Sequence, residues 1–179
     1  MIIVGIDPGV TGALALITDK GYQTVADLPV MVRTSLRVKG KNGQMRTKET
    51  HQVNAAALAE ILREWTAGHD KNEVHVFIEK CQAMPGKIKG SDKAQSSSGT
   101  FSLGLSAGII EGVVAACGLP HTLTHPATWK AKLQLNHKEK SQMRARAIQL
   151  FPTADLHRVK DHNRAEALLL AHYGHQITY

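Results

Sequence analysis

Four acidic residues occupy positions from which their carboxylates could act together on a phosphate ester. Asp7 and Glu79 each end a short apolar run, and Asp161 and Glu166 lie near the beginning of an apolar helical stretch. Neighbouring carboxylates repel one another unless a cation lies between them, and Mg²⁺ binds such oxygen ligands. Two ions about 3.5–4 Å apart can activate a water molecule and stabilise the leaving oxygen of a phosphodiester. The four residues therefore form a candidate site for two Mg²⁺ ions, for which Mn²⁺ could substitute.

Each of these acids also has an ordinary structural explanation, which the sequence leaves open. Asp7 begins Asp-Pro-Gly, a good turn on conformational grounds alone. Glu79 could be a solvated residue at the end of a strand. Glu166 fits a capping box that begins at Asn163, and Asp161 could cap the same helix or interact with its dipole. The ten histidines are scattered along the chain and show no HxH spacing, which argues against a zinc site.

The basic residues are segregated along the chain. Residues 31–51, 80–93 and 130–146 hold 16 of the 22 Lys and Arg residues but 3 of the 15 Asp and Glu residues, within a net charge of +7. A solvated surface usually mixes its signs, whereas clustered basic groups displace counterions from phosphates. The pattern favours a polyanionic partner, and a merely basic soluble protein is the alternative.

Length and composition set further bounds. A chain of 179 residues that is 42% hydrophobic can bury one core and is short for two domains. Gly and Glu interrupt its longest apolar stretches, so no stretch is expected to cross a bilayer. The first residues lack the features of a signal peptide, and the two cysteines form no CxxC motif. We therefore expect a reducing cytoplasm, in a bacterial or phage-infected cell in preference to an organelle.

The elements that must position the acids follow from the apolar periodicity. Strands are predicted at Ile2–Asp7, Ala13–Thr18, 22–29, 74–79 and 120–124. Helices are predicted at 54–68, 98–117, 138–150 and 163–173, with a short one beginning at Pro126. Residues 31–51 show neither period and are predicted to be a flexible basic loop or insertion. The order predicts an α/β fold, a mixed five-stranded sheet flanked by helices, in which the first and fourth strands can be neighbours beneath the last helix.

The predicted helix at 98–117 carries a line of glycines. Gly104, Gly108 and Gly112 recur at every fourth residue, beside two apolar stripes. Each glycine inside a helix costs about 0.5–1 kcal/mol relative to alanine. The line therefore indicates that another backbone approaches closely, either in a second copy of the chain or in the chain's own sheet.

Several motifs together resemble the RuvC group of Holliday-junction resolvases. They are GIDPG at residues 5–9 followed by Gly12, IE at 78–79 and RAEALLLA at 164–171, in the order and spacing of that family. AMPG at 83–86, FSLG at 101–104 and PATWK at 126–130 resemble its phage and organellar branch. The resemblance extends from Met1 to about Gly174, and residues 31–51 match least well.

The resemblance implies a ribonuclease H-like fold, a homodimer, and paired metal-dependent nicks placed symmetrically across a four-way DNA junction. Asp7 and Glu79 match the first two acidic ligands of the family, and Glu166 matches the last. The family places Asp or His three residues before the last ligand, where this chain has Asn163. Asp161 is therefore our choice for the fourth ligand, and His162 is the alternative, called the reserve ligand.

The same resemblance indicates DNA contacts. Lys130 and Lys140 match basic residues that contact the region of the scissile phosphate in the family, and Lys87, Lys89 and Arg144 are further candidates. Gln82 stands where bacterial members have an aromatic residue that stacks on junction bases. The motifs therefore do not explain how this chain would open the crossover.

Two other function classes use similar features. Actin-like ATPases and sugar kinases begin with a phosphate-binding hairpin similar to residues 7–12, but they need a second hairpin and a duplicated domain that this length does not accommodate. A DNA-binding module without catalysis would tolerate loss of the carboxylates. The preferred interpretation is a single nuclease domain over residues 1–179, which acts as a homodimer on branched DNA and not at a membrane.

Overall fold

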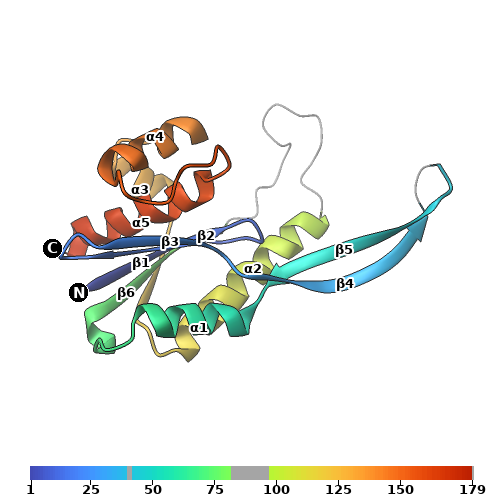
Figure 1. Cartoon of the computed structure of the whole chain (residues 1–179), viewed down its shortest axis with the longest axis horizontal. Helices are drawn as coiled ribbons and strands as arrows, with labels where there is room; N and C mark the ends of the chain where they lie inside the picture. The colour runs from blue at the N-terminus through green and yellow to red at the C-terminus, as the bar shows by residue number, and fades with distance from the viewer. Residues whose placement is uncertain (40–41, 82–96, 179) are drawn as a thin grey trace.

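A computed structural model describes residues 1–39, 42–81 and 97–178 (Figure 1). Its centre is a five-stranded sheet in the order β3-β2-β1-β6-β7. The strands are β1 (Ile2–Asp7), β2 (Ala13–Thr18), β3 (Gln23–Asp27), β6 (Val74–Glu79) and β7 (His121–Thr124). β2 is antiparallel to both β1 and β3, whereas β6 is parallel to both β1 and β7. The predicted mixed five-stranded α/β fold is confirmed.

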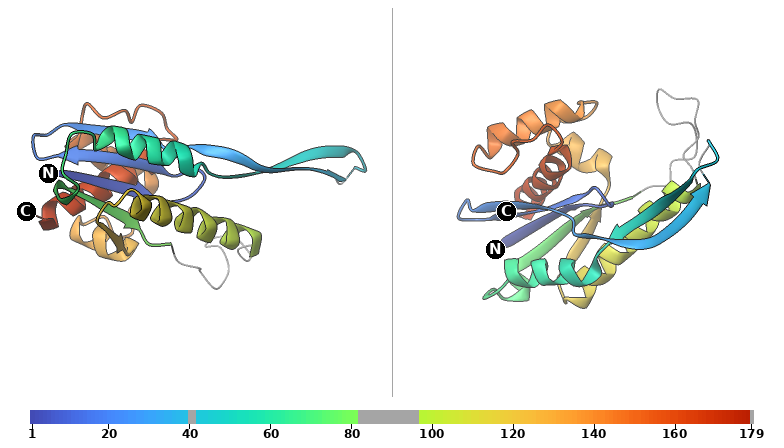
Figure 2. Two further views of the ribbon diagram at one scale, coloured as in Figure 1. Left: turned by 90° about the horizontal axis from the view of Figure 1, so that it is seen from below. Right: turned by 45° about the vertical axis from the view of Figure 1, so that its right-hand side comes forward.

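Helices cover both faces of this sheet (Figures 1 and 2). On one face, α5 (His162–Thr178) packs on β1 and β2, and α3 (Pro126–Lys132) and α4 (Lys140–Leu150) pack on α5. The other face carries α1 (Ala55–Trp65) and α2 (Ser97–Ala116), and a single 3-10 turn, η1 (Lys71–Glu73), leads into β6. The predicted helices are therefore present, with ends that differ by a few residues.

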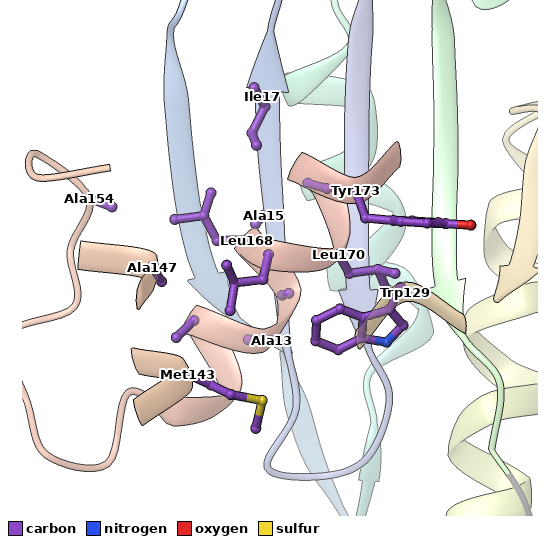
Figure 3. Packing of buried hydrophobic residues seen from close by; sticks show 14 of the residues in the cluster. Ala13, Ala15, Ile17, Trp129, Met143, Ala147, Ala154, Leu168, Leu170 and Tyr173 are labelled. Carbon is purple, nitrogen blue, oxygen red and sulfur yellow. The ribbon is translucent and has the colours of Figure 1, made fainter. Parts of the chain in front are cut away.

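The alternation of side chains along the strands produces two cores, one on each face of the sheet. Ile3, Ala15 and Phe77 face α5 and pack with Trp129 and Leu168 (Figure 3 shows part of this cluster). The alternate residues of the same strands pack under α1 and α2, and they include Ile2, Val4, Ile6, Leu14, Val76 and Ile78. Because both faces are covered, β1 is apolar at almost every position.

Gly5 allows α5 to lie directly against β1. A Cβ atom at this position would lie 2.2 Å from the carbonyl oxygen of Ala167 and 2.6 Å from the backbone nitrogen of Ala171. No side chain fits into that space, which explains a glycine in the middle of a buried strand. Glu166, the neighbour of Ala167, is thereby held close to the end of β1.

Residues 31–51 do not form the loop that the sequence predicts. They lie in an antiparallel ribbon of β4 (Val30–Lys39) and β5 (Met45–Val53), which projects from the body of the molecule (Figures 1 and 2). Most described side chains between residues 30 and 51 are exposed. The loop prediction is wrong because cross-strand backbone pairing defines these strands, which have no buried face over most of their length.

The glycine line of α2 faces open space. Among the described residues, no atom lies within 4 Å of a Cβ built at Gly104, Gly108 or Gly112. Packing of these glycines on the chain's own sheet, one of the two explanations above, is therefore excluded. Phe101 on the same helix is 64% exposed. We expect a helix face that is this apolar and this exposed to be buried against another surface.

The composition of α2 corrects another expectation. Residues Ser98–Ala116 form one helix that is long and apolar enough to cross a membrane, by length and composition only, and 17% of its most apolar stretch is buried inside the chain. The expectation that no stretch reaches this length is wrong, because scattered Gly, Ser and Glu residues do not lower the average hydropathy enough.

Candidate active site

The ends of β1 and β6 bring Asp7 and Glu79 together. The parallel register pairs Ile6 with Ile78, so the next residue of each strand lies at the same edge of the sheet. Glu166 of α5 is 8% exposed, and its charge acts on both other carboxylates. Two strand ends and one helix therefore join three of the four predicted acids.

Two of these carboxylates, those of Asp7 and Glu79, resist ionisation. Burial, followed by the charges of Glu166 and Glu79, raises the pKa of Asp7 well above its usual value. Burial also raises the pKa of Glu79, although Lys130 and a hydrogen bond from Trp129 act in the opposite direction. A nearby cation would favour the ionised forms. The electrostatics are thus those of a site that gains from binding positive charge.

Trp129 fixes the position of Glu79. Its indole nitrogen donates a hydrogen bond of 2.8 Å to Oε2 of Glu79. The ring itself is completely buried in the core beneath α5. In the sequence, Trp129 is part of a family motif, but nothing in its local pattern indicates this partner. It is a positioning residue that only the tertiary structure reveals.

Two lysines act electrostatically on these carboxylates, and their contact with DNA stays a prediction. Nζ of Lys130 lies 3.1 Å from Oε2 of Glu166 and 5.0 Å from the centroid of the Trp129 ring. The charges of Lys130 and Lys140 both lower the pKa of Asp7 and of Glu79, which partly offsets burial. The structure therefore gathers acids and lysines from β1, β6, α3, α4 and α5.

The donor chemistry of this cluster fits a hard divalent cation. In the described part of the chain, however, no three His, Cys, Asp or Glu side chains are close enough together to hold one. Glu166 is engaged by Lys130 and Glu79 by Trp129, so each gives an oxygen to a protein donor. Three carboxylates, two of them with raised pKa, are the oxygen ligands that Mg²⁺ prefers. To bind a cation through these oxygens, Glu79 would have to release Trp129, and Glu166 would have to release Lys130.

The structure does not bring Asp161 to the other acids, which corrects its assignment as a ligand. Its fully buried carboxylate accepts hydrogen bonds of 2.7 Å from both the backbone nitrogen and Nε of Arg158. Burial opposes ionisation of Asp161, but these hydrogen bonds and the charges of Arg158 and Arg164 outweigh it and lower the pKa. A carboxylate already neutralised by arginine is a poor metal ligand. Its structural role before α5, left open by the sequence, is the one observed.

His162, the reserve ligand, is the first residue of α5 and is half-buried. It lines a pocket of about 400 Å³ together with Thr11, Gly12, Arg158 and Asn163. None of the three gathered carboxylates lines this pocket. The side chain of Asn163 donates a hydrogen bond to the carbonyl oxygen of Thr11, which ties α5 to the loop after Asp7. A ligand role for His162 stays a prediction.

The remaining predicted DNA contacts divide into two groups. Arg144 donates hydrogen bonds of 3.0 and 2.6 Å to the carbonyl oxygen of Leu156 and one of 3.1 Å to that of His157. Its guanidinium thereby secures the loop before α5, and its contact with DNA stays a prediction. Lys87, Lys89 and Gln82 lie outside the described residues.

Solved structures share this architecture. The chain matches Thermus thermophilus RuvC with a TM-score of 0.53 and 17% sequence identity, over 99% of this chain and 97% of that one. The chain has the RuvC fold. T. thermophilus RuvC in complex with a Holliday junction substrate matches with a TM-score of 0.54 and 14% identity, over 99% of this chain and 96% of that one. The expected ribonuclease H-like fold is confirmed by these RuvC structures.

No protein-family model and no curated protein matches the sequence. The two RuvC structures come from a bacterium, so they do not support the phage and organellar branch that the motifs favour. That assignment stays a prediction.

Proposed function

We propose that this chain is a structure-specific endodeoxyribonuclease that resolves four-way DNA junctions by paired, symmetric hydrolysis of phosphodiester bonds. The observation that carries the proposal is the convergence of Asp7, Glu79 and Glu166, with Lys130 and Lys140 beside them. The RuvC fold supports it, since T. thermophilus RuvC is solved in complex with a Holliday junction substrate.

Asp7, Glu79 and Glu166 would hold the metal, two Mg²⁺ ions or Mn²⁺ in their place. When bound, these ions would supply Lewis-acid stabilisation of the phosphodiester. The chain's own groups do the rest: Trp129 orients Glu79, Lys130 and Lys140 bring positive charge to the phosphate, and burial of Asp7 restricts access of bulk water to its carboxylate. His162 is the reserve for a fourth ligand.

The functional unit that we propose is a homodimer. One site makes one nick, whereas symmetric resolution of a junction needs two nicks related by a two-fold axis. The exposed glycine line of α2 allows two helices to approach closely. Burial of about 1,200–2,000 Å² in total is typical of a stable interface. A second copy of α2 would cover the face that no described residue of the same chain covers.

Cleavage of a labelled synthetic four-way junction, beside matched duplex and flap substrates, tests the proposal. With Mg²⁺ or Mn²⁺, we expect paired nicks at symmetric positions in the junction and little cutting of duplex. Selective binding without cutting would instead identify a DNA-binding module that lacks catalysis. One observation favours this second candidate. Among the described residues, no three His, Cys, Asp or Glu side chains lie close enough together to hold a metal ion as they stand.

A further inference from the structure

The ribbon of β4 and β5 has no role in the site described above, yet it is one of the most basic parts of the chain. It extends on the side of the sheet where β1 and β6 end (Figures 1 and 2). At about 3.3 Å per residue, a strand as long as β4 reaches about 33 Å, close to one turn of B-DNA. The ribbon is therefore long enough to follow DNA over a full turn.

The ribbon has basic side chains on both faces. Successive side chains of a strand point to opposite faces, and side chains paired across two strands share a face. Arg37 and Lys39 of β4 therefore lie on one face, called face 1. Leu36 and Val38 lie on the opposite face, called face 2, together with their cross-strand partners Lys48 and Arg46 of β5. All four basic side chains are exposed, and none has an ion-pair partner among the described residues.

The root of the ribbon is fixed to the body. Val53 at the end of β5 is completely buried, and the backbone nitrogen of Asn54 donates a 2.8 Å hydrogen bond to the carbonyl oxygen of Pro29. β5 packs on α2, and the guanidinium of Arg33 lies 5.8 Å from the centroid of the Phe101 ring. The direction of the ribbon is thereby tied to α2.

We propose that this ribbon passes between two duplex arms of a branched DNA, with each face on the backbone of a different arm. The inference rests on the proposed function and deepens it by assigning how the branch itself is recognised. A ribbon that lay in the groove of one duplex would turn one face to solvent and leave two basic residues without phosphates. Basic groups on both faces fit phosphates on both sides.

The exposed apolar side chains of the ribbon are consistent with this placement. Leu36 is 55% exposed on face 2 and Met45 is 54% exposed on face 1. Apolar side chains of this kind insert against sugars and bases where DNA stacking is disturbed. A second copy of the ribbon is a poor occupant by comparison, because it would bring like charges together.

Charge-neutral variants of each face test the proposal. Arg37→Gln/Lys39→Gln removes the charge of face 1, Arg46→Gln/Lys48→Gln that of face 2, and Lys20→Gln/Arg63→Gln is a control of equal charge at exposed residues outside the ribbon. Affinity for a synthetic four-way junction and for linear duplex is measured against salt concentration, with EDTA to prevent cleavage. Circular dichroism confirms that each variant is folded.

Each face variant is expected to weaken junction binding about tenfold and to reduce the slope of log affinity against log salt by about two. Duplex binding by the face variants should change no more than with the control. The proposal is overturned if only one face matters, if neither does, or if junction and duplex lose affinity equally. It is also overturned if the variants convert a dimer to a monomer without DNA, because the ribbon would then bind a second copy.

These outcomes are distinct from a failure of the proposed function. Wild-type protein that neither prefers nor cuts the junction contradicts the function itself, whatever the variants do. Wild-type protein that cuts the junction, with face variants that bind like the control, contradicts the role of the ribbon alone.

Discussion

The ammonium group of Lys130 lies 3.1 Å from a carboxylate oxygen of Glu166, and their side chains are 23% and 10% exposed. Lys130 also acts electrostatically on Asp7 and Glu79. One lysine therefore places its charge among all three carboxylates. In the metal-free protein, it performs part of the neutralisation that a divalent cation would complete.

Lys130→Met is expected to lower the melting temperature in EDTA by a few degrees, since loss of a charged hydrogen bond at this site costs about 1–3 kcal/mol. Mg²⁺ should then raise the melting temperature of the variant more than that of the wild type. Lys132→Met, on an exposed side of the same helix, is the control and should do neither. Equal Mg²⁺ shifts in all three proteins would show that Lys130 does not compensate these acids.

Trp129→Phe keeps an apolar ring but removes the hydrogen-bond donor to Glu79. Loss of such a partner typically lowers metal affinity or activity about 10–100-fold. We expect a higher Mg²⁺ requirement for junction cleavage, measured as rate against Mg²⁺ concentration, and a circular dichroism spectrum like that of the wild type. A variant with the wild-type metal dependence would mean that the hydrogen bond is only structural.

Asp7→Asn is expected to abolish cleavage while junction binding is retained. Because the folded-state pKa of Asp7 is raised, its protonated form is favoured by folding, and stability is lost as pH rises from the usual carboxyl pKa through the raised value. The metal-free variant should therefore become progressively more stable than the wild type over that rise in pH, as measured by urea unfolding. Cleavage by the variant at the wild-type rate would refute the metal site.

Asp161→Asn should affect stability and leave the cleavage chemistry intact. The folded-state pKa of Asp161 is lowered, so the carboxylate contributes stability above its unfolded pKa, and this contribution is lost as pH falls through the lowered value. At neutral pH, the variant should lose about 1–3 kcal/mol of unfolding free energy. The difference from the wild type should shrink in acid. Normal stability with abolished cleavage would restore Asp161 as a ligand.

Gly108→Leu tests whether a second copy of α2 packs on the exposed glycine face of this helix. A side chain meets no described atom there within one chain, so the variant should fold, as judged by circular dichroism. If two copies of α2 pack together, sedimentation velocity should show a dimer for the wild type and a monomer for the variant, which would make single nicks or none. A monomeric wild type, with and without junction, would contradict the dimer. Flotation with lipid vesicles would reveal whether a membrane covers the helix instead.

Much of this fold could be predicted from the sequence, because strong burial leaves a periodic pattern. β1 and α5 are apolar over most of their length, and their relation follows from Gly5 and the motifs around Asp7 and Glu166. The ribbon could not be predicted, since most of its side chains are exposed and no buried face marks its strands in the sequence. For the same reason, its opposed charged faces become visible only with the cross-strand register.

The errors at the site have a different physical origin. The sequence places Asp161 near α5, but it does not show that Arg158 and Arg164 neutralise the charge of its carboxylate. Arg144 and Trp129 likewise meet partners that are remote in sequence, namely Leu156 and Glu79. Acids on strand ends could be grouped from the topology, whereas the neutralising partners of each acid depend on tertiary contacts.

The three acids come from elements that are far apart along the chain, so they become available at different times during synthesis. Asp7 is synthesised before Glu79, and Glu166 follows both of them, in α5. α5 is also the helix that covers β1 and completes one of the two cores. A nascent or truncated chain therefore carries the first carboxylate without the last. The chain acquires the three gathered acids only together with α5, so incomplete products would lack the site that we propose.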